Sequence, residues 1–234
     1  MSKLPILMYH NITTDINKID KLTVHKDLLE KQFKYLRKKG YKTHFLNELE
    51  NKKSLSNKNI IITFDDVTKN QLEYAVPLLK KYNLKATFFI PFAYIGKYDE
   101  WNDNSEPIMS IEDLKNINNE FELAYHSFYH RKYNYLTKEE IVEDFYLSEK
   151  YSKENNLLLH QSIAYPYGNF PKKNPKKELF FKILRDNKMI YGFRIGNRIN
   201  KFPFKNPFEI NRIDIKGNES FFKFIFKINF GKLF

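Results

Sequence analysis

Short apolar runs alternate with amphipathic helical segments along most of the chain, and each apolar run ends in polar residues. Residues 5–9 (PILMY) form the first run, and the β-branched and aromatic residues 59–64 are typical of a central strand. Between these runs, residues 26–39 place apolar side chains at helical spacing, and Gly40 favours a stop. Strands that alternate with helices predict an α/β fold with a parallel sheet or barrel.

The later elements continue the same pattern. Further strands are expected at 85–91, 121–125, 162–165, 189–195 and 208–215, and further helices at 71–82, from 110, at 137–153, at 175–187 and from 219. With 234 residues and 42% hydrophobic composition, a single domain over residues 1–234 can bury a substantial core. Functional groups in such folds gather where strands end, and His10, Asp65, Asp66, His126 and Pro166-Tyr167 all fall at those points.

Two adjacent carboxylates, Asp65 and Asp66, follow the apolar run 59–64. They would repel each other unless a cation or a shared proton resolves the conflict. Because side chains alternate along a strand, the two carboxylates point differently, so one can bind an ion while the other approaches its water. For either aspartate alone, a helix N-cap is the alternative interpretation.

His126 and His130 are four residues apart, which places both imidazoles on one side of a helical turn. Two histidines and one carboxylate make a three-ligand metal site with open positions for water and substrate. The chain has no cysteine, so a thiolate ligand or nucleophile is excluded. A non-haem iron enzyme could use the same triad, but that chemistry gives Asp65 no role.

Four segments, taken in their order along the chain, resemble the polysaccharide deacetylases with a NodB homology domain, carbohydrate esterase family 4. These segments are PILMYH (5–10), TFDD (63–66), HSFYH (126–130) and AYPYG (164–168). The N-terminal Met-Tyr-His strand is similar to that of one subgroup of these enzymes. The resemblance implies a distorted (β/α) barrel with fewer than eight regular strands, and removal of an acyl group, acetyl above all, from an amino sugar. It also implies a divalent metal held by Asp66, His126 and His130, with zinc favoured over nickel, cobalt or iron.

The same resemblance assigns roles to individual residues. Asp65 looks like the general base, and the backbone N–H of Tyr167 looks like a donor to the oxyanion. No histidine follows His160, so the late histidine that commonly supplies the acid in this family is missing, and His10 becomes the candidate acid. Pro166 and Tyr165 are expected to contact the substrate.

Three residues depart from the family pattern. Val67 stands where a glycine is usual, Tyr165 where an arginine is usual, and Tyr125 where a small residue is common. Loss of that arginine removes a partner that would orient Asp65. A non-catalytic carbohydrate-binding relative is therefore an alternative, although retention of Asp65 beside the complete ligand set argues against it.

Positive charge is concentrated in the last quarter of the chain. Residues 171–234 carry 16 basic and 5 acidic side chains, so 11 of the 12 excess charges lie there. This asymmetry indicates an anion-facing surface, which could meet phospholipid headgroups or a nucleotide-linked or phosphorylated sugar. No nucleic-acid-binding module is recognisable, so no nucleic-acid partner is expected.

The basic, aromatic segment 219–234 is expected to form a terminal helix packed on the barrel, and interfacial binding to an anionic membrane is the alternative. No run of about 18 apolar residues exists, and the N-terminus lacks a signal-peptide pattern. These features predict a cytoplasmic protein, with peripheral contact at the inner face of the membrane as the alternative. The expected substrate is an N-acylated amino sugar, nucleotide-linked or lipid-linked, used for a surface glycan.

Overall fold

Seven parallel strands close into a barrel in the computed structural model, which describes residues 1–103 and 105–231. In order around the barrel they are β2 (Ile6–Tyr9), β12 (Ile210–Asp214), β10 (Tyr191–Ile195), β9 (Leu159–Ala164), β8 (Glu122–Tyr125), β7 (Thr87–Ile90) and β6 (Asn59–Asp65). The ring is complete because β2 pairs with both β12 and β6. The expected distorted (β/α) barrel with fewer than eight regular strands is confirmed.

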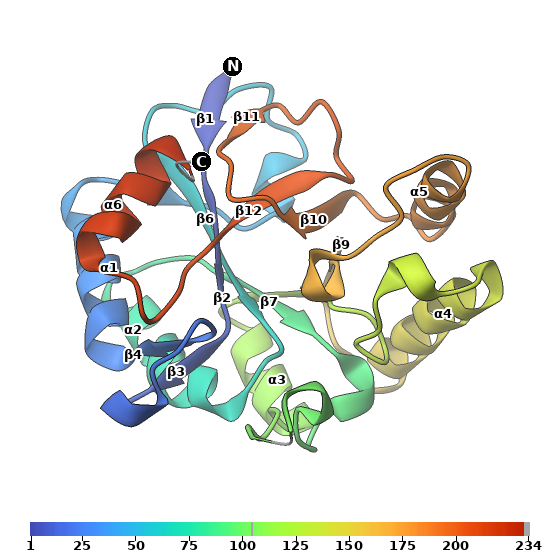
Figure 1. Ribbon diagram of the computed structural model, residues 1–234, viewed down its shortest axis with the longest axis horizontal. Helices are drawn as coiled ribbons and strands as arrows, with labels where there is room; N and C mark the ends of the chain where they lie inside the picture. Colours follow the sequence, from blue (N-terminus) through green and yellow to red (C-terminus); the bar gives the residue numbers. More distant parts are fainter. Residues whose placement is uncertain (104, 232–234) are drawn as a thin grey trace.

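Helices surround this barrel, with α1, α2 and α6 on one side and α4 and α5 on the other (Figure 1). Their bounds are Lys26–Lys38 (α1), Val76–Lys81 (α2), Ile111–Asn118 (α3), Lys138–Glu154 (α4), Lys176–Asp186 (α5) and Phe221–Phe230 (α6). None of the helices in the described residues has the length and apolar composition needed to cross a bilayer.

Several short elements were not expected from the sequence. Strand β1 (Ser2–Leu4) pairs antiparallel with β11 (Asn200–Phe202), β3 (Asn11–Thr13) pairs parallel with β4 (Thr23–His25), and β5 (Lys42–Thr43) pairs with the first residues of β6. The helix expected at 71–82 is a π-helical turn, Gln71–Ala75, followed by α2. Pro77 has no backbone N–H to donate to the preceding turn, so regular α-helical bonding cannot run through it.

The buried strand β6 has two different faces. Ile61 belongs to the smaller apolar cluster inside the barrel, while alternate residues belong to the larger cluster between barrel and helices, namely Ile60, Ile62 and Phe64. Thr63 and Asp65 share the inward face with Ile61 because side chains alternate along a strand. Burial on both faces explains why β6 reads as a continuous apolar run, and it directs Asp65 into the barrel.

The last helix, α6, begins after Ser220, whose side chain accepts the backbone N–H of Lys223. Phe224 and Ile228 on its inner face are buried, so the helix packs on the body of the protein. The expected terminal helix is therefore present over Phe221–Phe230, whereas residues 232–234 of the expected segment lie outside the described residues.

Candidate metal centre

Three side chains from the C-terminal end of the barrel converge on one point. Asp66 directly follows β6, His126 directly follows β8, and His130 lies in the loop beyond β8. Asp66 Oδ1 lies 3.4 Å from the Nε2 atoms of both His126 and His130. The three potential ligand atoms lie within 4.8 Å of one another, and all three residues are buried. A carboxylate and two imidazoles at this spacing fit a divalent cation.

The protonation states of these groups also fit a cation. His126 Nδ1 lies 2.8 Å from the carbonyl oxygen of Ala164, so Nδ1 carries the proton and the Nε2 lone pair faces Asp66. Burial lowers the pKa of His126 to about 4 and also lowers that of His130, which keeps both rings neutral at pH 7. Asp66 Oδ1 is buried and has no hydrogen-bond partner among the described residues, so it is free to bind an ion.

The neighbouring carboxylate, Asp65, is held by a buried arginine. Nη1 and Nη2 of Arg212, on β12, donate to Oδ1 and Oδ2 of Asp65 at 2.5 and 2.6 Å. Both side chains are almost completely buried. A bidentate pair of this kind fixes the plane of the carboxylate as well as its position.

These two adjacent aspartates have opposite pKa shifts. Burial raises the pKa of Asp65, but the charge of Arg212, with smaller contributions from His126 and His10, outweighs burial and holds it well below its usual range. Burial, reinforced by the negative charge of Asp65, raises the pKa of Asp66. Asp65 is therefore ionised at neutral pH. Asp66 needs a nearby positive charge to be ionised at the same pH.

His10 and His126 both approach the same oxygen of Asp65, each with Nε2 at 3.8 Å from Oδ2. Burial lowers the pKa of His10, while the charge of Asp65 opposes that shift. A cavity of about 270 Å³ joins these groups, and its lining includes His10, Asp65, Asp66, His126, His130, Trp101, Tyr167, Arg212 and Asp214. The cavity therefore brings the candidate base, acid and ligands together.

The backbone around the site is strained. Left-handed conformations occur at Asp66, Val67, Ser127, His130 and Tyr167, with φ between 45° and 75°. Glycine adopts such angles at little cost, whereas a β-branched residue there costs about 1–3 kcal/mol. A glycine at position 67 would adopt this conformation without strain. Val67 instead holds strained backbone next to Asp66 in this chain.

A buried carboxylate on α4 holds the loop that carries His130. Asp144 accepts the backbone N–H groups of Phe128 at 3.0 Å and Tyr129 at 3.3 Å, and the hydroxyl of Tyr133 at 2.8 Å. These bonds satisfy donors that the irregular loop could not pair internally. Asp144 thereby fixes the path of the chain between His126 and His130.

Aromatic side chains border the candidate metal ligands. The ring of Trp101, the only tryptophan in the sequence, stacks on His130 with centroids 4.0 Å apart, and Tyr94 meets Trp101 edge-on. The ring centroids of Tyr167 and His130 lie 4.9 Å apart, and the amine of Lys132 lies above the Tyr167 ring. Trp101 and Tyr167 thus line the cavity with aromatic rings beside His130.

Tyr165 and Pro166, expected to contact the substrate, do not line the cavity. Tyr165 follows β9 on the outward face, is buried among the helices, and donates its hydroxyl hydrogen to the carbonyl of Phe208. Strand alternation explains this position because Ala164, the preceding residue, faces the barrel interior. Tyr167 and Gly168, which follow Pro166 in the same short turn, do line the cavity.

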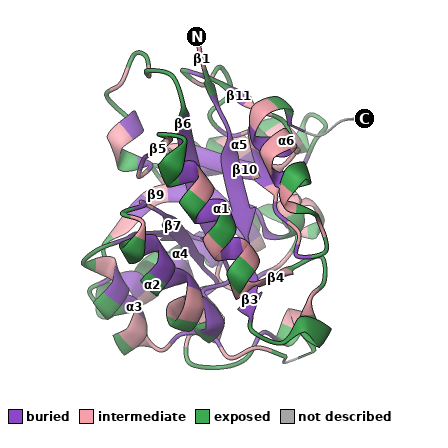
Figure 2. Ribbon diagram, turned by 90° about the vertical axis from the view of Figure 1, so that its left-hand side faces the viewer, coloured by how far each residue is buried: buried purple, intermediate pink, exposed green. Residues whose placement is uncertain are grey.

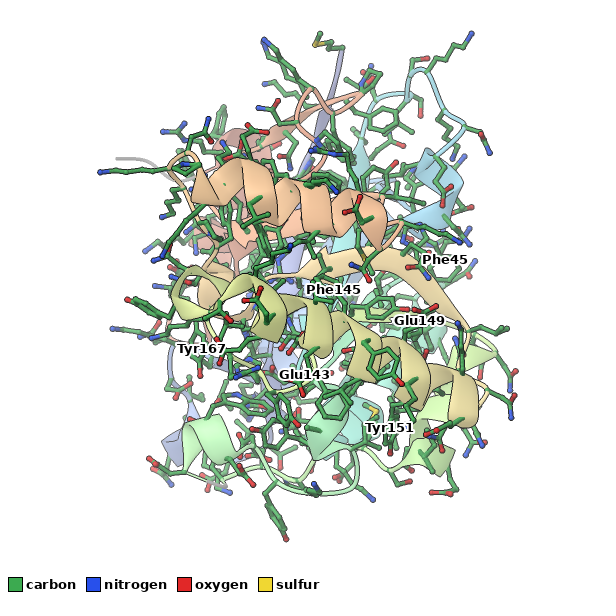
Figure 3. All side chains as sticks on the ribbon, turned by 90° about the vertical axis from the view of Figure 1, so that its right-hand side faces the viewer. Phe45, Glu143, Phe145, Glu149, Tyr151 and Tyr167 are labelled. Carbon is green, nitrogen blue, oxygen red and sulfur yellow. The ribbon has the colours of Figure 1, made fainter. Side chains whose placement is uncertain are left out.

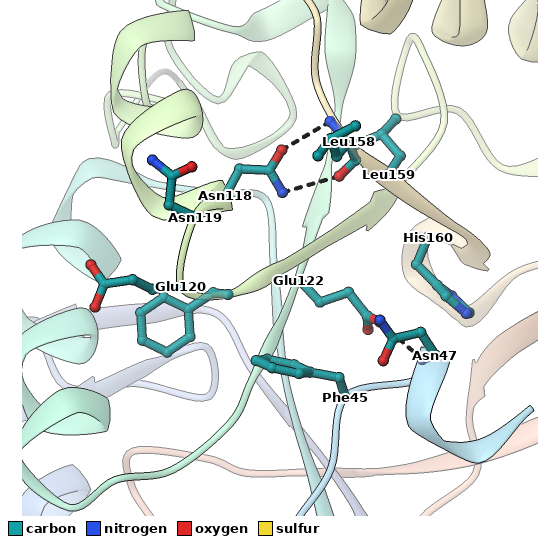
Figure 4. A pocket seen from close by; sticks show the side chains of 10 residues that line it. Phe45, Asn47, Asn118, Asn119, Glu120, Glu122, Leu158, Leu159 and His160 are labelled. Atoms are coloured by element: carbon teal, nitrogen blue, oxygen red, sulfur yellow. Dashed lines mark hydrogen bonds between the residues drawn. The ribbon is translucent and has the colours of Figure 1, made fainter.

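A larger cavity of about 440 Å³ lies at the opposite end of the barrel (Figure 4). Figure 3 shows Phe45 of the larger cavity and Tyr167 of the smaller cavity on opposite sides of the molecule. The polar groups of the larger cavity are used internally: Glu122 accepts from Leu46, Asn47 and Thr87, and Asn118 bonds the backbone of Leu158. The smaller cavity is therefore the better candidate for chemistry.

Sequence reasoning missed Arg212, Trp101 and Asp144. A signal for Arg212 existed, because the expected strand 208–215 carries a basic residue within an apolar pattern, INRID (210–214). Arg212 and Asp214 share one face of that strand, and this face points into the barrel beside Asp65. Trp101 lies in a long loop for which no periodicity indicates a position.

Comparison with known proteins agrees with this fold. The family model described as "Polysaccharide deacetylase" matches residues 52–179. The protein YxkH of Bacillus subtilis is 30% identical over 181 residues, which are 75% of this chain and 60% of YxkH. A Staphylococcus aureus protein named poly-beta-1,6-N-acetyl-D-glucosamine N-deacetylase is 29% identical over 208 residues, 83% of this chain and 68% of its own length. The chain thus spans less than two thirds of YxkH.

Among solved structures, the Streptococcus pyogenes deacetylase PplD, in complex with acetate, superposes with a TM-score of 0.80. The match covers 97% of this chain and 98% of PplD at 22% identity, a level at which it establishes the fold alone. The family assignment rests on the family model, which covers more than half of the 234 residues. The chain belongs to the polysaccharide deacetylase family.

Proposed function

We propose that the protein is a metal-dependent deacetylase that hydrolyses the N-acetyl or another N-acyl group of an amino sugar. One observation carries the proposal: an ionised carboxylate, Asp65, lies next to a three-residue cluster suited to a divalent cation. Amide hydrolysis needs a base for water and a positive charge for the oxyanion, and this arrangement offers both. A relative named as an N-deacetylase of an N-acetylglucosamine polymer supports the substrate class.

In this proposal Asp66, His126 and His130 hold the cation, with zinc favoured over nickel, cobalt or iron. When bound there, the cation would polarise the amide carbonyl and make water more acidic. Asp66 has a raised pKa without an ion, so a positive charge close to Oδ1 would bring it into its ionised form.

Asp65 takes the proton of the attacking water. Because Arg212 holds the pKa of Asp65 low, the carboxylate is ready in its basic form but is a weak base, so it must act on water that is already acidified. His10 passes a proton to the leaving amine. His10 would first receive from Asp65 the proton taken from water. Its Nε2 atom lies 3.8 Å from Asp65 Oδ2, so a small movement or one water molecule is enough for this transfer.

The backbone N–H of Tyr167 is proposed to donate to the developing oxyanion, since Tyr167 lines the cavity beside His130. Tyr165 and Pro166 are proposed to act on the substrate indirectly, by holding the turn that presents Tyr167. The bond from the Tyr165 hydroxyl to the carbonyl of Phe208 ties this turn to the rest of the fold.

The carrier of the amino sugar is a further part of the proposal. The excess of basic residues after position 171 favours an anionic carrier, a nucleotide or a lipid, in the cytoplasm or at the inner face of the membrane. Contact of the C-terminal helix with an anionic membrane would suit a lipid-linked substrate.

Acetate release tests the proposed activity. The purified protein would be stripped of metal, reloaded with zinc, nickel, cobalt or ferrous iron in turn, and offered β-1,6-linked and β-1,4-linked N-acetylglucosamine oligosaccharides. We expect metal-dependent release that Asp65→Asn reduces by a factor of about 10²–10⁴, the usual range for loss of a general base. The matched control is Asp186→Asn, an exposed aspartate of α5. Equal turnover by Asp65→Asn and the wild type would exclude Asp65 as the base.

A further inference from the structure

One face of α6 carries large aromatic side chains that point away from the protein. Phe222 is 81% exposed and Phe230 is 69% exposed, with Phe226 half-buried between them. These residues are four apart, so they form a single stripe along the helix. The rings of Phe226 and Phe230 lie 5.0 Å apart, which makes the stripe continuous. A continuous exposed apolar stripe indicates a site of contact with another protein, a membrane or a ligand.

The opposite face of α6 is firmly attached to the protein. Phe224 and Ile228 are buried, and the amine of Lys227 is buried where it donates to the carbonyl of Asp214 at 2.6 Å and to Glu219. A buried lysine with these partners fixes the rotation of the helix about its axis. The aromatic stripe is therefore presented to solvent by a packed helix.

Helix α1 lies beside α6 and contributes positive charge. The Tyr35 ring packs edge-on against Phe221 at 5.6 Å, and the amine of Lys31 lies 4.6 Å from the centre of the Phe221 ring. Figure 2 shows the exposed outer face of α1 next to α6. From Lys31 onward every charged residue up to position 39 is basic and exposed: Lys31, Lys34, Arg37, Lys38 and Lys39.

We infer that the exposed faces of α1 and α6 bind the surface of an anionic phospholipid bilayer. Phe222, Phe226 and Phe230 would enter the interfacial layer, and the lysines of α1 would meet the headgroups. Charge selects this partner, because neither 31–39 nor 221–231 contains an acidic residue to repel anionic lipid, and the two acidic residues of α1, Asp27 and Glu30, lie in its first half. The inference extends the membrane contact named in the proposed function from α6 to α1, does not depend on deacetylation, and concerns a surface that shares no residue with the candidate metal cluster.

Sedimentation with vesicles tests the inference on the full chain. We expect binding to vesicles of phosphatidylcholine with phosphatidylglycerol, and much weaker binding to phosphatidylcholine alone. F222S/F230S should weaken binding at least tenfold. K31Q/K34Q/K38Q should weaken it by about fivefold for each lysine near the surface, equivalent to about 1 kcal/mol each.

Matched controls come from α4, which is exposed on the other side of the barrel. Tyr146→Ser removes an aromatic ring that is 60% exposed, and K138Q/K150Q/K153Q removes the same charge as the α1 variant. Both should bind vesicles as the wild type does, and thermal melting should show that all variants are folded. Acetate release from soluble oligosaccharides should not change in F222S/F230S, so failure of the lipid experiment is separable from failure of the proposed activity.

Two results would overturn the inference. The first is absence of binding to the anionic vesicles, or equal loss of binding in F222S/F230S on α6 and in Tyr146→Ser on α4. The second is self-association of the wild type that F222S/F230S abolishes while vesicles are ignored, which would assign the stripe to contact between two copies of the chain.

Discussion

Arg212 on β12 binds both carboxylate oxygens of Asp65 on β6, at 2.5 and 2.6 Å, inside the barrel. From the family resemblance, an arginine partner for Asp65 is expected at position 165, which is a tyrosine in this chain. The inward faces of all seven strands meet in one interior, and a guanidinium can therefore reach the same carboxylate from another strand. Asp65 therefore has a bidentate arginine partner although residue 165 is a tyrosine.

Removing Arg212 should impair both stability and activity. Arg212→Met leaves a buried carboxylate without its counter-ion, which costs about 3–5 kcal/mol of unfolding free energy. Arg212→Lys keeps a charge but loses the two parallel hydrogen bonds, so an intermediate cost is expected. Urea unfolding and acetate release measure the two effects. Lys80→Gln, which breaks the exposed pair with Glu120, is the control and should cost at most about 1 kcal/mol. Wild-type turnover in Arg212→Met would show that the pair has no catalytic importance.

A bound cation should stabilise the folded protein. At a free zinc concentration 100 times the dissociation constant, linkage gives about 2.7 kcal/mol, which raises the melting temperature by several degrees. His130→Gln should abolish this shift. His160→Gln, which changes a histidine at the other end of the barrel beside Glu50, should preserve it. A zinc-induced shift that is equal in both variants would exclude His130 as a ligand.

Acid should destabilise the metal-free protein through His126. Its pKa is about 4 when folded and 6.5 in the reference state, so between these values the unfolded chain binds the extra proton. Stability is therefore lost as the pH falls through this window, by at most about 3 kcal/mol for this residue. Unfolding free energies at about pH 7 and about pH 5 should differ more in the wild type than in His126→Gln. An identical pH dependence would contradict the assignment of His126 as a buried, neutral ring.

Asp144 should control metal affinity without touching the metal. Asp144→Ala leaves two backbone N–H groups and the Tyr133 hydroxyl without their acceptor, and each unsatisfied group costs about 1–3 kcal/mol. The loosened loop should weaken zinc binding by about 10–100-fold, as loss of a supporting partner commonly does. Asp144→Asn, which keeps one acceptor, should be milder. Competition with a chelating dye measures the affinity.

The control for this prediction is Glu143→Ala, because Glu143 is the exposed neighbour of Asp144 on α4. It should bind zinc as the wild type does. Were Asp144→Ala to fold and bind zinc with unchanged affinity, the loop between His126 and His130 would be shown to need no support from α4.

Local patterns predict a parallel sheet or barrel and the convergence of the candidate ligands, and the choice of a barrel follows from the family resemblance. The run 59–64 predicts a strand, and polar residues at the ends of parallel strands must meet at one end of the fold. The outward position of Tyr165 was also within reach, since alternation from Ala164 places it on the opposite face. The turn at Gln71–Ala75 was not, because helical periodicity does not distinguish a π-helical turn from an α-helix.

Contacts between distant strands and loops could not be read from the sequence. The pair of Arg212 and Asp65 joins residues that are 147 positions apart, and it depends on how the barrel closes. The stacking of Trp101 on His130 depends on the path of a loop that contains no long regular element. Asp144 looked like one of several acidic residues of an exposed helix, and only packing against the 127–130 loop distinguishes it.

Anomalous diffraction from crystals of the zinc-loaded protein would show whether Asp66, His126 and His130 bind the metal. We expect one strong anomalous peak, from zinc, among Asp66 Oδ1, His126 Nε2 and His130 Nε2, at about 2.0–2.2 Å from each atom. We also expect Asp65 to remain bound to Arg212 outside the coordination sphere. A map with no peak at these three side chains, or a zinc ion held by other residues of the cavity, would contradict the account.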